Sequence, residues 1–412
     1  MKKISVIGLG YIGLPTAAVI AAQGVRVIGV DVNQIAVDTI NQGKIHIVEP
    51  DLDALVHEVV RKGLLKAVTK PEPADAFLIA VPTPFKDNHE PDLSYVKAAA
   101  LAIAPVLSKG NLVILESTSP VGTTDKMQAW LSEARPDLSF PGESNLNPDI
   151  NIAYCPERVL PGKVLHELVN NDRVVGGVTS SCAEKAANLY RIFVRGSCLI
   201  TNARTAEMCK LTENAFRDVN IAFANELSLI CDKLRINVWE LIKLANRHPR
   251  VDILQPGPGV GGHCIAVDPW FIVDSAPEAA RLIRTAREVN DHKPHHVVEQ
   301  VSLAVQGMKS PTIACLGLSF KPDIDDLRES PAVEIVKLIA EQELGNLLIA
   351  EPNIDLLPLE LSKFSNINLL DPEAAIAKAD VVLMLVNHRQ FYQLDPSLLN
   401  GKKVIDTRGV WQ

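Results

Sequence analysis

The segment that ends at Cys264 combines a thiol with a high density of glycine. In Gly257-Pro258-Gly259-Val260-Gly261-Gly262-His263-Cys264 four glycines precede the cysteine, and Asp268 follows four residues later. Because glycine carries no side chain, a ligand can approach such a loop closely and the thiol stays accessible. We therefore predict that Cys264 is a nucleophile. The other cysteines, six of the seven in the chain, are scattered without a Cys-x-x-Cys pair and are expected to be reduced and inert.

A second chemical pattern lies in the middle of the chain. The stretch Thr205–Leu234 contains neither Pro nor Gly and carries an apolar stripe, which predicts one long helix. Lys210, Asn214 and Arg217 stand at positions i, i+4 and i+7 and therefore share one face of it. A lysine near a thiol lowers the thiol pKa from about 8.5 and can stabilise an oxyanion. A solvated polar surface is the alternative interpretation of the same face.

A nucleotide-binding pattern opens the chain. Gly8-x-Gly10-x-x-Gly13 follows an apolar run and starts a predicted helix, Tyr11–Ala22, so that turn amides and the helix N-terminus can hold a pyrophosphate. We predict cofactor contacts along this turn, including Tyr11 and Ile12. Asp31 ends the next strand, where a carboxylate binds the adenosine ribose and repels a 2′-phosphate. The pattern therefore favours NAD over NADP.

A thiolate together with NAD indicates a particular reaction. An aldehyde is a poor hydride donor until a nucleophile adds to it, whereas a thiohemiacetal can lose a second hydride and leave a thioester that water hydrolyses. A two-fold oxidation of an alcohol to an acid thus predicts a cysteine, an oxyanion partner and a carboxylate that activates water. Glu157 and Asp268 are the carboxylate candidates.

Three threonines follow predicted strands, where ligands bind in open α/β sheets. Thr83 lies in Val81-Pro82-Thr83-Pro84, Thr118 follows the strand 112–115, and Thr124 comes shortly after it. Each hydroxyl either contacts the cofactor or substrate or caps a helix.

Composition narrows the class of protein. The chain has 412 residues, of which 47% are apolar and 22% charged, so a packed protein of two or three domains is expected. A net charge of -8 without a basic run gives no support to nucleic-acid binding. No segment is long and apolar enough to span a bilayer, and the early glycines argue against a signal peptide. We expect a cytoplasmic protein with no metal site.

Short apolar runs alternate with helical patterns at both ends of the chain. Strands are predicted at 4–7, 25–30, 76–81 and 112–115, and again at 312–317, 347–350, 381–386 and 403–406. Ala74-Asp75 and Ala379-Asp380 precede corresponding strands, which indicates two domains of related plan. The predicted fold is α/β: two Rossmann-like doubly wound domains, 1–200 for NAD and 308–412 for the substrate nucleotide, joined by a mainly helical domain, 201–307. Helix 205–234 is expected either to form a dimer interface or to be buried within one subunit.

Six segments in order resemble the UDP-sugar 6-dehydrogenase family over nearly the whole chain. They are Gly8–Gly13, Glu116–Gly122, Cys155–Arg158, Ala206–Asn214, Gly257–Cys264 and Phe320–Arg328. The resemblance implies Cys264 as nucleophile and Lys210 as oxyanion stabiliser and proton partner. It also implies that Thr118, Glu157 and Asp268 order or activate water, and that Asn214 holds the substrate.

The resemblance further implies contacts with both ligands. Arg328 would meet NAD, as would the turn residues and Thr83, Thr124 and Asp31. Substrate contacts are implied for Arg158, Val159, Lys210, Asn214, Arg217, His248, Arg250, Gly261 and Lys321. In the family, the residues matching His248 and Arg250 can reach across a dimer interface, which favours a homodimer.

One departure bears on the sugar. Glucose-specific relatives carry a second glutamate four residues after the one matching Glu157, and here that position is Pro161. The segments 157–162 and 246–264 are instead similar to the bacterial branch that oxidises UDP-N-acetyl-D-mannosamine for surface polysaccharide (enterobacterial common antigen) synthesis.

Other functions stay open on the sequence. The same oxidation could act on UDP-N-acetylglucosamine, UDP-glucose or UDP-N-acetylgalactosamine, because epimers are separated by pocket shape alone. A one-step hydroxyacid or sugar-acid dehydrogenase would also pair a glycine turn with a helical Lys–Asn face, but it would not need Cys264. An NAD-sensing regulator with a redox-active thiol would not need the set of basic residues Arg158, Arg217, Arg250, Lys321 and Arg328.

Overall fold

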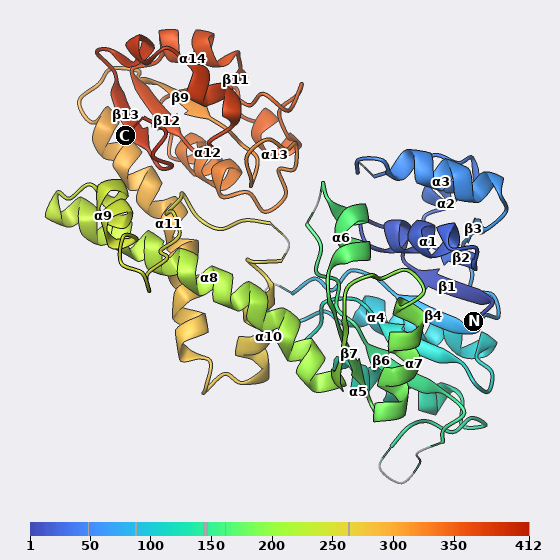
Figure 1. Cartoon of the computed structure of the whole chain (residues 1–412). Coiled ribbons are helices and arrows are strands. Elements are labelled where there is room, and N and C mark those ends of the chain that lie inside the picture. Colours follow the sequence, from blue (N-terminus) through green and yellow to red (C-terminus); the bar gives the residue numbers. More distant parts are fainter. Residues whose placement is uncertain are drawn as a thin grey trace. The chain divides into compact units, whose positions relative to one another are not determined.

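The computed structural model describes residues 1–47, 49–86, 89–142, 145, 147–160, 162–262 and 264–411. The chain divides into two compact units, each with its own sheet (Figure 1). The first unit comprises Met1–Glu213 and Asp274–Pro277, and the second comprises Asn214–Val273 and Glu278–Gln412.

The first unit is built on an eight-stranded sheet in the order β3-β2-β1-β4-β5-β6-β7-β8. Its strands are β1 (Lys3–Ile7), β2 (Arg26–Val30), β3 (Leu65–Val68), β4 (Ala76–Ile79), β5 (Leu112–Leu115), β6 (Asn151–Tyr154), β7 (Arg173–Gly177) and β8 (Cys198–Asn202). Neighbouring strands run parallel except β6 and β7, which pair antiparallel. The predicted doubly wound sheet is therefore confirmed, with one reversal toward its far edge.

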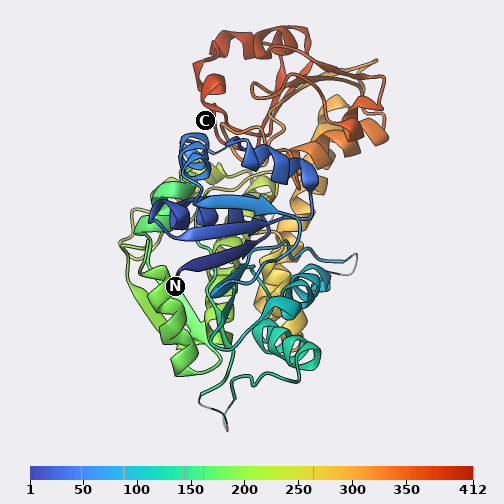
Figure 2. The same ribbon diagram turned by 90° about the vertical axis from the view of Figure 1, so that its right-hand side faces the viewer.

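Helices cover both faces of this sheet. They are α1 (Gly13–Ala22), α2 (Gln34–Asn41), α3 (Leu52–Arg61), α4 (Ser94–Ile103) with a 3₁₀ turn at Ala104–Val106, α5 (Thr123–Ala134), α6 (Val164–Asn170) and α7 (Ser180–Tyr190). Alternate strand residues enter different cores: Leu78 packs in the cluster that contains α1 and α7, whereas Phe77 and Ile79 pack in the cluster that contains α4 and α5. In Figure 2, helices α4 and α5 lie on the opposite side of the strands from α7.

The second unit combines long helices with a five-stranded parallel sheet in the order β11-β10-β9-β12-β13. Its strands are β9 (Thr312–Leu316), β10 (Asn346–Ala350), β11 (Ile367–Leu369), β12 (Val381–Met384) and β13 (Lys403–Asp406). Its helices are α8 (Ala203–Leu234), which begins in the first unit, α9 (Val238–Ala245), α10 (Asp268–Ser275), α11 (Arg281–Val305), α12 (Pro331–Glu341), α13 (Leu359–Ser362) and α14 (Pro372–Lys378), with 3₁₀ turns at Arg389–Gln393 and Pro396–Leu399. Val297 and Val301 of α11 share a core with Ile335 of α12.

The two sheets repeat the same local design, as the sequence predicted. β1 and β9 each end at a glycine with positive φ, Gly8 at 91° and Gly317 at 92°. Asp75 and Asp380 each accept a hydrogen bond from a backbone N–H at the start of the central strand, Lys3 at 3.1 Å and Thr312 at 2.9 Å. Both units therefore use an aspartate to bind the start of the central strand and a glycine with positive φ for the turn that follows it.

Several local expectations are confirmed with small shifts. Ser330 caps α12 by accepting a hydrogen bond from Ala332 N–H, and Pro331 occupies its first turn. The helix predicted from Tyr11 begins at Gly13, because the turn residues are needed to reverse the chain. Of the helices in the described part of the chain, none combines the length and apolar character that crossing a bilayer requires.

Candidate active site

The glycine turn after β1 shows why each glycine is needed. A Cβ at Gly8 would lie 2.5 Å from the carbonyl oxygen of Ala80, and a Cβ at Gly13 would lie 1.8 Å from the oxygen of Gly8. These two glycines therefore permit the packing of the turn on the sheet. Gly10 differs, since a Cβ there meets no described atom within 4 Å. Its backbone is the part of the turn that a ligand can approach.

Asp31 is fixed beside this turn. One carboxylate oxygen accepts a hydrogen bond from Leu9 N–H at 2.9 Å, and the other accepts one from Asn33 N–H at 2.9 Å. Apolar Ile12 occupies the N-cap of α1, so its side chain does not satisfy the first helical amides. An open backbone, uncapped helix amides and an oriented carboxylate together fit a dinucleotide with free ribose hydroxyls.

The predicted threonines have different surroundings. Thr83 donates its hydroxyl proton to the carbonyl oxygen of Thr118, and both residues are half-buried. Thr124 is fully buried, and its hydroxyl donates to Glu207 at 2.6 Å. Glu207 also accepts from Gly122 N–H at 2.6 Å and Thr124 N–H at 2.8 Å, so its carboxylate occupies the N-terminus of α5. Burial raises the pKa of this carboxyl group, which sequence reasoning did not single out.

Glu157 is a buried, paired carboxylate in the first unit. One oxygen accepts from Arg158 N–H at 2.7 Å, and the other lies 2.7 Å from the guanidinium of Arg173, which is 2% exposed. The Arg158 guanidinium is paired with Glu213, at 3.0 Å from Nε and 2.6 Å from Nη2. If Arg158 contacts a substrate, its guanidinium is therefore already paired with a carboxylate of α8.

A buried polar cluster surrounds Glu157 and was not predicted. The Tyr190 hydroxyl donates to Glu116 at 2.6 Å, and the Arg173 guanidinium lies over the Tyr190 ring at 5.4 Å. Burial, more than any neighbour, raises the pKa of Glu116 to about 7 and that of Cys155 to about 12. Charged residues on strands or directly after them can be noticed in a sequence, but their pairing depends on contacts between distant segments.

The glycine-rich loop lies in the second unit. A Cβ at Gly261 would lie 2.3 Å from the carbonyl oxygen of Glu329, and Gly262 packs against the ring of Phe320. The fold therefore brings together two of the sequence motifs, the glycine-rich loop and the segment that begins at Phe320. Cys264 is exposed, and His263 lies outside the described residues.

Asp268 connects the thiol segment to α8. Its N–H donates to the carbonyl oxygen of Cys264 at 2.8 Å, and its buried carboxylate accepts a hydrogen bond from the Asn214 side chain. Two of the predicted catalytic residues are thus in direct contact. Of the others, Thr118, Glu157 and Lys210 belong to the first unit and Cys264 to the second.

The predicted anion-binding residues of the second unit are exposed. They are Arg217, His248, Arg250, Lys321 and Arg328. Arg328 is also held by Asp326 through two hydrogen bonds of 2.9 and 2.7 Å. Val159, which belongs to the first unit, is half-buried against its core. Pro161 lies outside the described residues.

Arg408 is a basic residue that sequence reasoning missed. Its guanidinium contacts Gly257, where a Cβ would lie 2.7 Å from Nη1, and its Nε donates to the carbonyl oxygen of Leu385 at 2.9 Å. Burial lowers its pKa to about 10. Its position directly after β13 was the available signal, because ligands bind at the carboxyl ends of such strands. Among the described residues, no group of three or more His, Cys, Asp or Glu side chains could hold a metal ion.

Comparison with known proteins places this fold and site in one class, the NAD-dependent dehydrogenases. Residues 2–194 match the NAD-binding domain of the UDP-glucose/GDP-mannose dehydrogenase family, residues 204–292 its central domain and residues 314–412 its UDP-binding domain. The chain belongs to this family, and the predicted NAD cofactor is confirmed by the first of these matches.

Similar proteins carry two kinds of name. An NDP-N-acetyl-D-galactosaminuronic acid dehydrogenase of Ralstonia nicotianae is 66% identical over 100% of this chain and 96% of its own length. A UDP-N-acetyl-D-mannosamine dehydrogenase of Yersinia pestis is 63% identical over 100% and 99%. Among solved structures, the UDP-N-acetyl-mannosamine dehydrogenase Cap5O of Staphylococcus aureus is 44% identical over 99% of this chain and 95% of its own, with a TM-score of 0.85.

Proposed function

We propose that this protein is a UDP-N-acetyl-D-mannosamine 6-dehydrogenase, which oxidises the C6 alcohol to the uronate in two NAD-dependent steps. The observation that carries the proposal is the exposed Cys264 thiol at the end of a glycine-rich loop, in a family that reduces NAD. NAD supplies the hydride acceptor in both oxidations. The chain's own residues do the rest of the chemistry.

The first oxidation needs a base and a way to hold the alcohol. Lys210 takes the proton of the C6 hydroxyl and stabilises the alkoxide, and Asn214 holds the sugar. When the aldehyde has formed, the Cys264 thiolate adds to its carbon and gives a thiohemiacetal whose oxygen again faces Lys210. Thr118 orders the water of the site.

The second oxidation ends in hydrolysis. Lys210, which protonated the thiohemiacetal oxygen, takes that proton back as the C6 hydride leaves. This gives a thioester on Cys264, and water then attacks the carbonyl carbon. The C–S bond breaks, the uronate leaves with the water oxygen, and the thiol regains its proton. Glu157 or Asp268 takes the proton of the attacking water, and the contact of Asp268 with Asn214 keeps that carboxylate oriented.

Ligand contacts divide along the chain. Residues 1–200 hold NAD through the turn Gly8–Gly13, Asp31, Thr83 and Thr124, with Arg328 added from the segment after β9. Residues 308–412 hold the UDP group, and 201–307 supply Lys210, Cys264 and the dimer contact. Substrate contacts come from Arg158, Val159, Arg217, His248, Arg250, Gly261 and Lys321.

The homodimer forms through α8. Phe216, Phe223 and Ile230 are 70%, 52% and 44% exposed and recur every seven residues, so they form one apolar stripe. A second copy of α8 is the complementary surface for such a stripe. The enzyme acts in the cytoplasm and supplies an acidic sugar nucleotide for bacterial surface polysaccharide such as enterobacterial common antigen.

A second substrate has specific support. The Ralstonia relative is named for a galactosaminuronic product and is slightly more similar than the mannosamine relatives. UDP-N-acetyl-D-mannosamine is the proposed substrate because several similar proteins are named for it. They include the Yersinia protein, an Escherichia coli protein at 63% identity and Cap5O.

The test is a count of NADH per sugar. Purified protein with NAD is given UDP-N-acetyl-D-mannosamine, UDP-N-acetylgalactosamine, UDP-N-acetylglucosamine or UDP-glucose. We expect two NADH per sugar and the highest kcat/KM with the mannosamine nucleotide. If two NADH form per sugar but another UDP-sugar is preferred, the proposed mechanism stands and the proposed substrate is wrong. If one NADH forms per sugar, the thioester mechanism is wrong.

A variant pair isolates the nucleophile. Cys264→Ser should lower uronate formation on the order of 10³-fold or more, because serine is not a thiolate, while the Kd for NAD stays unchanged. Cys198→Ser, a half-buried cysteine of β8, is the matched control and should retain activity. Undiminished uronate formation by Cys264→Ser would contradict the covalent mechanism.

A further inference from the structure

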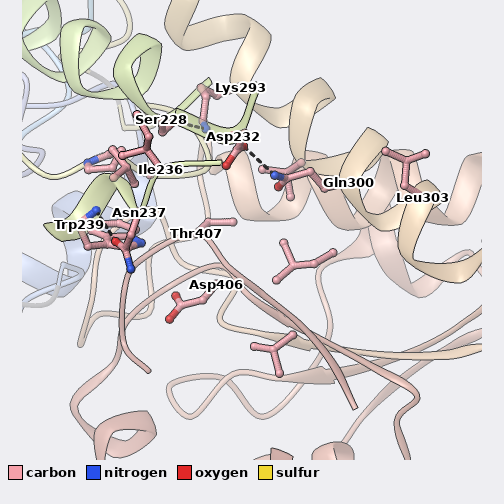
Figure 3. Close-up of a pocket in the computed structure, with 16 residues that line it drawn as sticks. Ser228, Asp232, Ile236, Asn237, Trp239, Lys293, Gln300, Leu303, Asp406 and Thr407 are labelled. Atoms are coloured by element: carbon pink, nitrogen blue, oxygen red, sulfur yellow. Dashed lines mark hydrogen bonds between the residues drawn. The ribbon is translucent and has the colours of Figure 1, made fainter. Parts of the chain in front are cut away.

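A pocket of about 410 Å³ lies in the second unit, apart from the residues assigned above (Figure 3). It is formed by the end of α8, the start of α9, α11 and the edge strand β13. The sixteen described residues that line it include none of the predicted catalytic, cofactor or substrate residues. Its volume is within the range of about 300–1,000 Å³ that is typical of small-molecule sites.

Lys293 is a buried cation in the wall of this pocket. Its side chain is 5% exposed, and its ammonium donates to the hydroxyl of Ser228 at 2.8 Å (Figure 3). Among the described residues, Asp232 is the carboxylate whose charge acts on this ammonium, and it does so without a direct ion pair. Burial lowers its pKa to about 8, so the group is still largely protonated at neutral pH. The direct contact of this buried charge is with a neutral hydroxyl, and the charge of Asp232 acts on it from beyond ion-pair distance. An anion bound at the ammonium would supply a direct countercharge.

The two acidic residues of the pocket are already engaged. One oxygen of Asp232 accepts from His296 and from Gln300, each at 2.9 Å. Asp406 accepts three backbone hydrogen bonds, from the N–H groups of 408, 409 and 411. Both carboxylates therefore stabilise the pocket wall. Neither forms an ion pair with Lys293, although the charge of Asp232 acts on its ammonium from a longer distance.

Apolar side chains gather at the same pocket. Ile236, Leu303 and Val404 line it and are 48%, 69% and 40% exposed, and the half-buried Trp239 lies beside them. Exposed apolar groups around a buried cation suit a ligand that has both an apolar part and a negative charge.

We propose that this pocket is a second ligand site, which binds a small organic anion with its carboxylate or phosphate group on Lys293 and its apolar part against Trp239, Leu303 and Val404. The site is connected to the catalytic loop. Ser228 donates onward to the carbonyl oxygen of Asn225 at 2.6 Å, and the Asn225 side chain accepts from Gly257 N–H at 2.8 Å, where the glycine-rich loop begins. A bound anion thus shares one hydrogen-bonded chain with the loop that carries Cys264.

The test measures binding by calorimetry with phenyl phosphate, which combines a ring with an anion. Saturating UDP and NAD occupy the nucleotide sites, so the result is independent of the reaction proposed above. We expect saturable binding of phenyl phosphate, at least about tenfold tighter than that of inorganic phosphate or of benzyl alcohol. Absence of saturable binding would overturn the proposal.

Variants locate the site. Lys293→Met should weaken the binding of phenyl phosphate at least about tenfold, whereas Lys337→Met, at a partly exposed lysine of α12, should leave its affinity unchanged. Leu303→Asp places a negative charge at the rim without disturbing a core, and it should also weaken binding at least about tenfold. Leu282→Asp, on the same helix and 68% exposed, is its matched control. Wild-type affinity in Leu303→Asp, or in a folded Lys293→Met, would overturn the assignment.

Discussion

Glu116 shows how a single buried carboxyl group makes stability depend on pH. Its pKa is about 7 in the folded protein, raised from 4.5 mainly by burial, while the hydrogen bond from Tyr190 opposes the shift. The folded state therefore binds this proton more tightly than the unfolded state. The contribution is complete below about pH 4.5 and is lost as the pH rises to about 7.

Glu116→Gln should abolish this dependence, because the amide resembles the protonated acid and can still accept from Tyr190. We expect little change in urea unfolding at pH 5 and a gain of roughly 3 kcal/mol at pH 8, from about 1.4 kcal/mol per pKa unit. Glu133→Gln, exposed on α5, is the control and should change neither value. An equal loss of stability at both pH values would show that the ionised carboxylate is favoured in the fold.

Helix α8 carries the surface on which the proposed dimer depends. Phe223 is 52% exposed at the centre of the stripe that also contains Phe216 and Ile230. Phe223→Asp would place a charge in the middle of the proposed dimer contact, which costs several kcal/mol when no partner balances it. The measured mass in light scattering should fall from dimer to monomer at micromolar concentration.

Leu282→Asp supplies the comparison, because it introduces the same charge at a 68% exposed leucine of α11. It should leave the mass unchanged. If Phe223→Asp stays dimeric, the interface lies elsewhere on the chain.

Strands could be predicted from the sequence where a single physical signal, such as an unbroken apolar run, dominates. β4 and β5 are buried at every position and lie within the predicted strands 76–81 and 112–115, and the repeat of Asp75 at Asp380 identified the second sheet. β3, β6, β7, β8 and β11 were not predicted. β7 has two valines between an arginine and two glycines, which is too short an apolar run to recognise, and β8 is largely exposed. The reversal between β6 and β7 depends on pairing that no local pattern encodes.

The candidate site was predictable to a similar degree. Glycine, cysteine and acidic residues at fixed spacing identify the turn after β1 and the loop before Cys264, because their chemistry is local. The partners of these groups are distant in sequence: Glu207 reaches Thr124 over 83 residues, and Asn214 reaches Asp268 over 54. Such contacts follow from packing, so the sequence named Thr124, Asn214 and Asp268 but neither Glu207 nor the bonds that orient these residues.

At the scale of the whole molecule, each unit has its own hydrophobic core and its own ligand. The first unit carries the dinucleotide turn, and residues 314–412, which match the UDP-binding domain, lie in the second. We therefore expect each ligand to protect its own unit from amide hydrogen exchange. NAD alone should protect the turn 8–13 and the residues after Asp31, whereas UDP alone should protect the segments 257–262 and 318–321.

Gly10→Ala separates the two effects. A Cβ at Gly10 meets no described protein atom within 4 Å, and its φ is not in the left-handed region, so the variant should fold normally. The added methyl group nevertheless occupies the space that a pyrophosphate needs, and we expect NAD to bind at least about tenfold more weakly. In exchange measured by mass spectrometry, this variant should lose the protection by NAD and keep the protection by UDP. Loss of both would mean that the UDP site depends on an intact dinucleotide turn, and retention of both would mean that NAD does not approach Gly10.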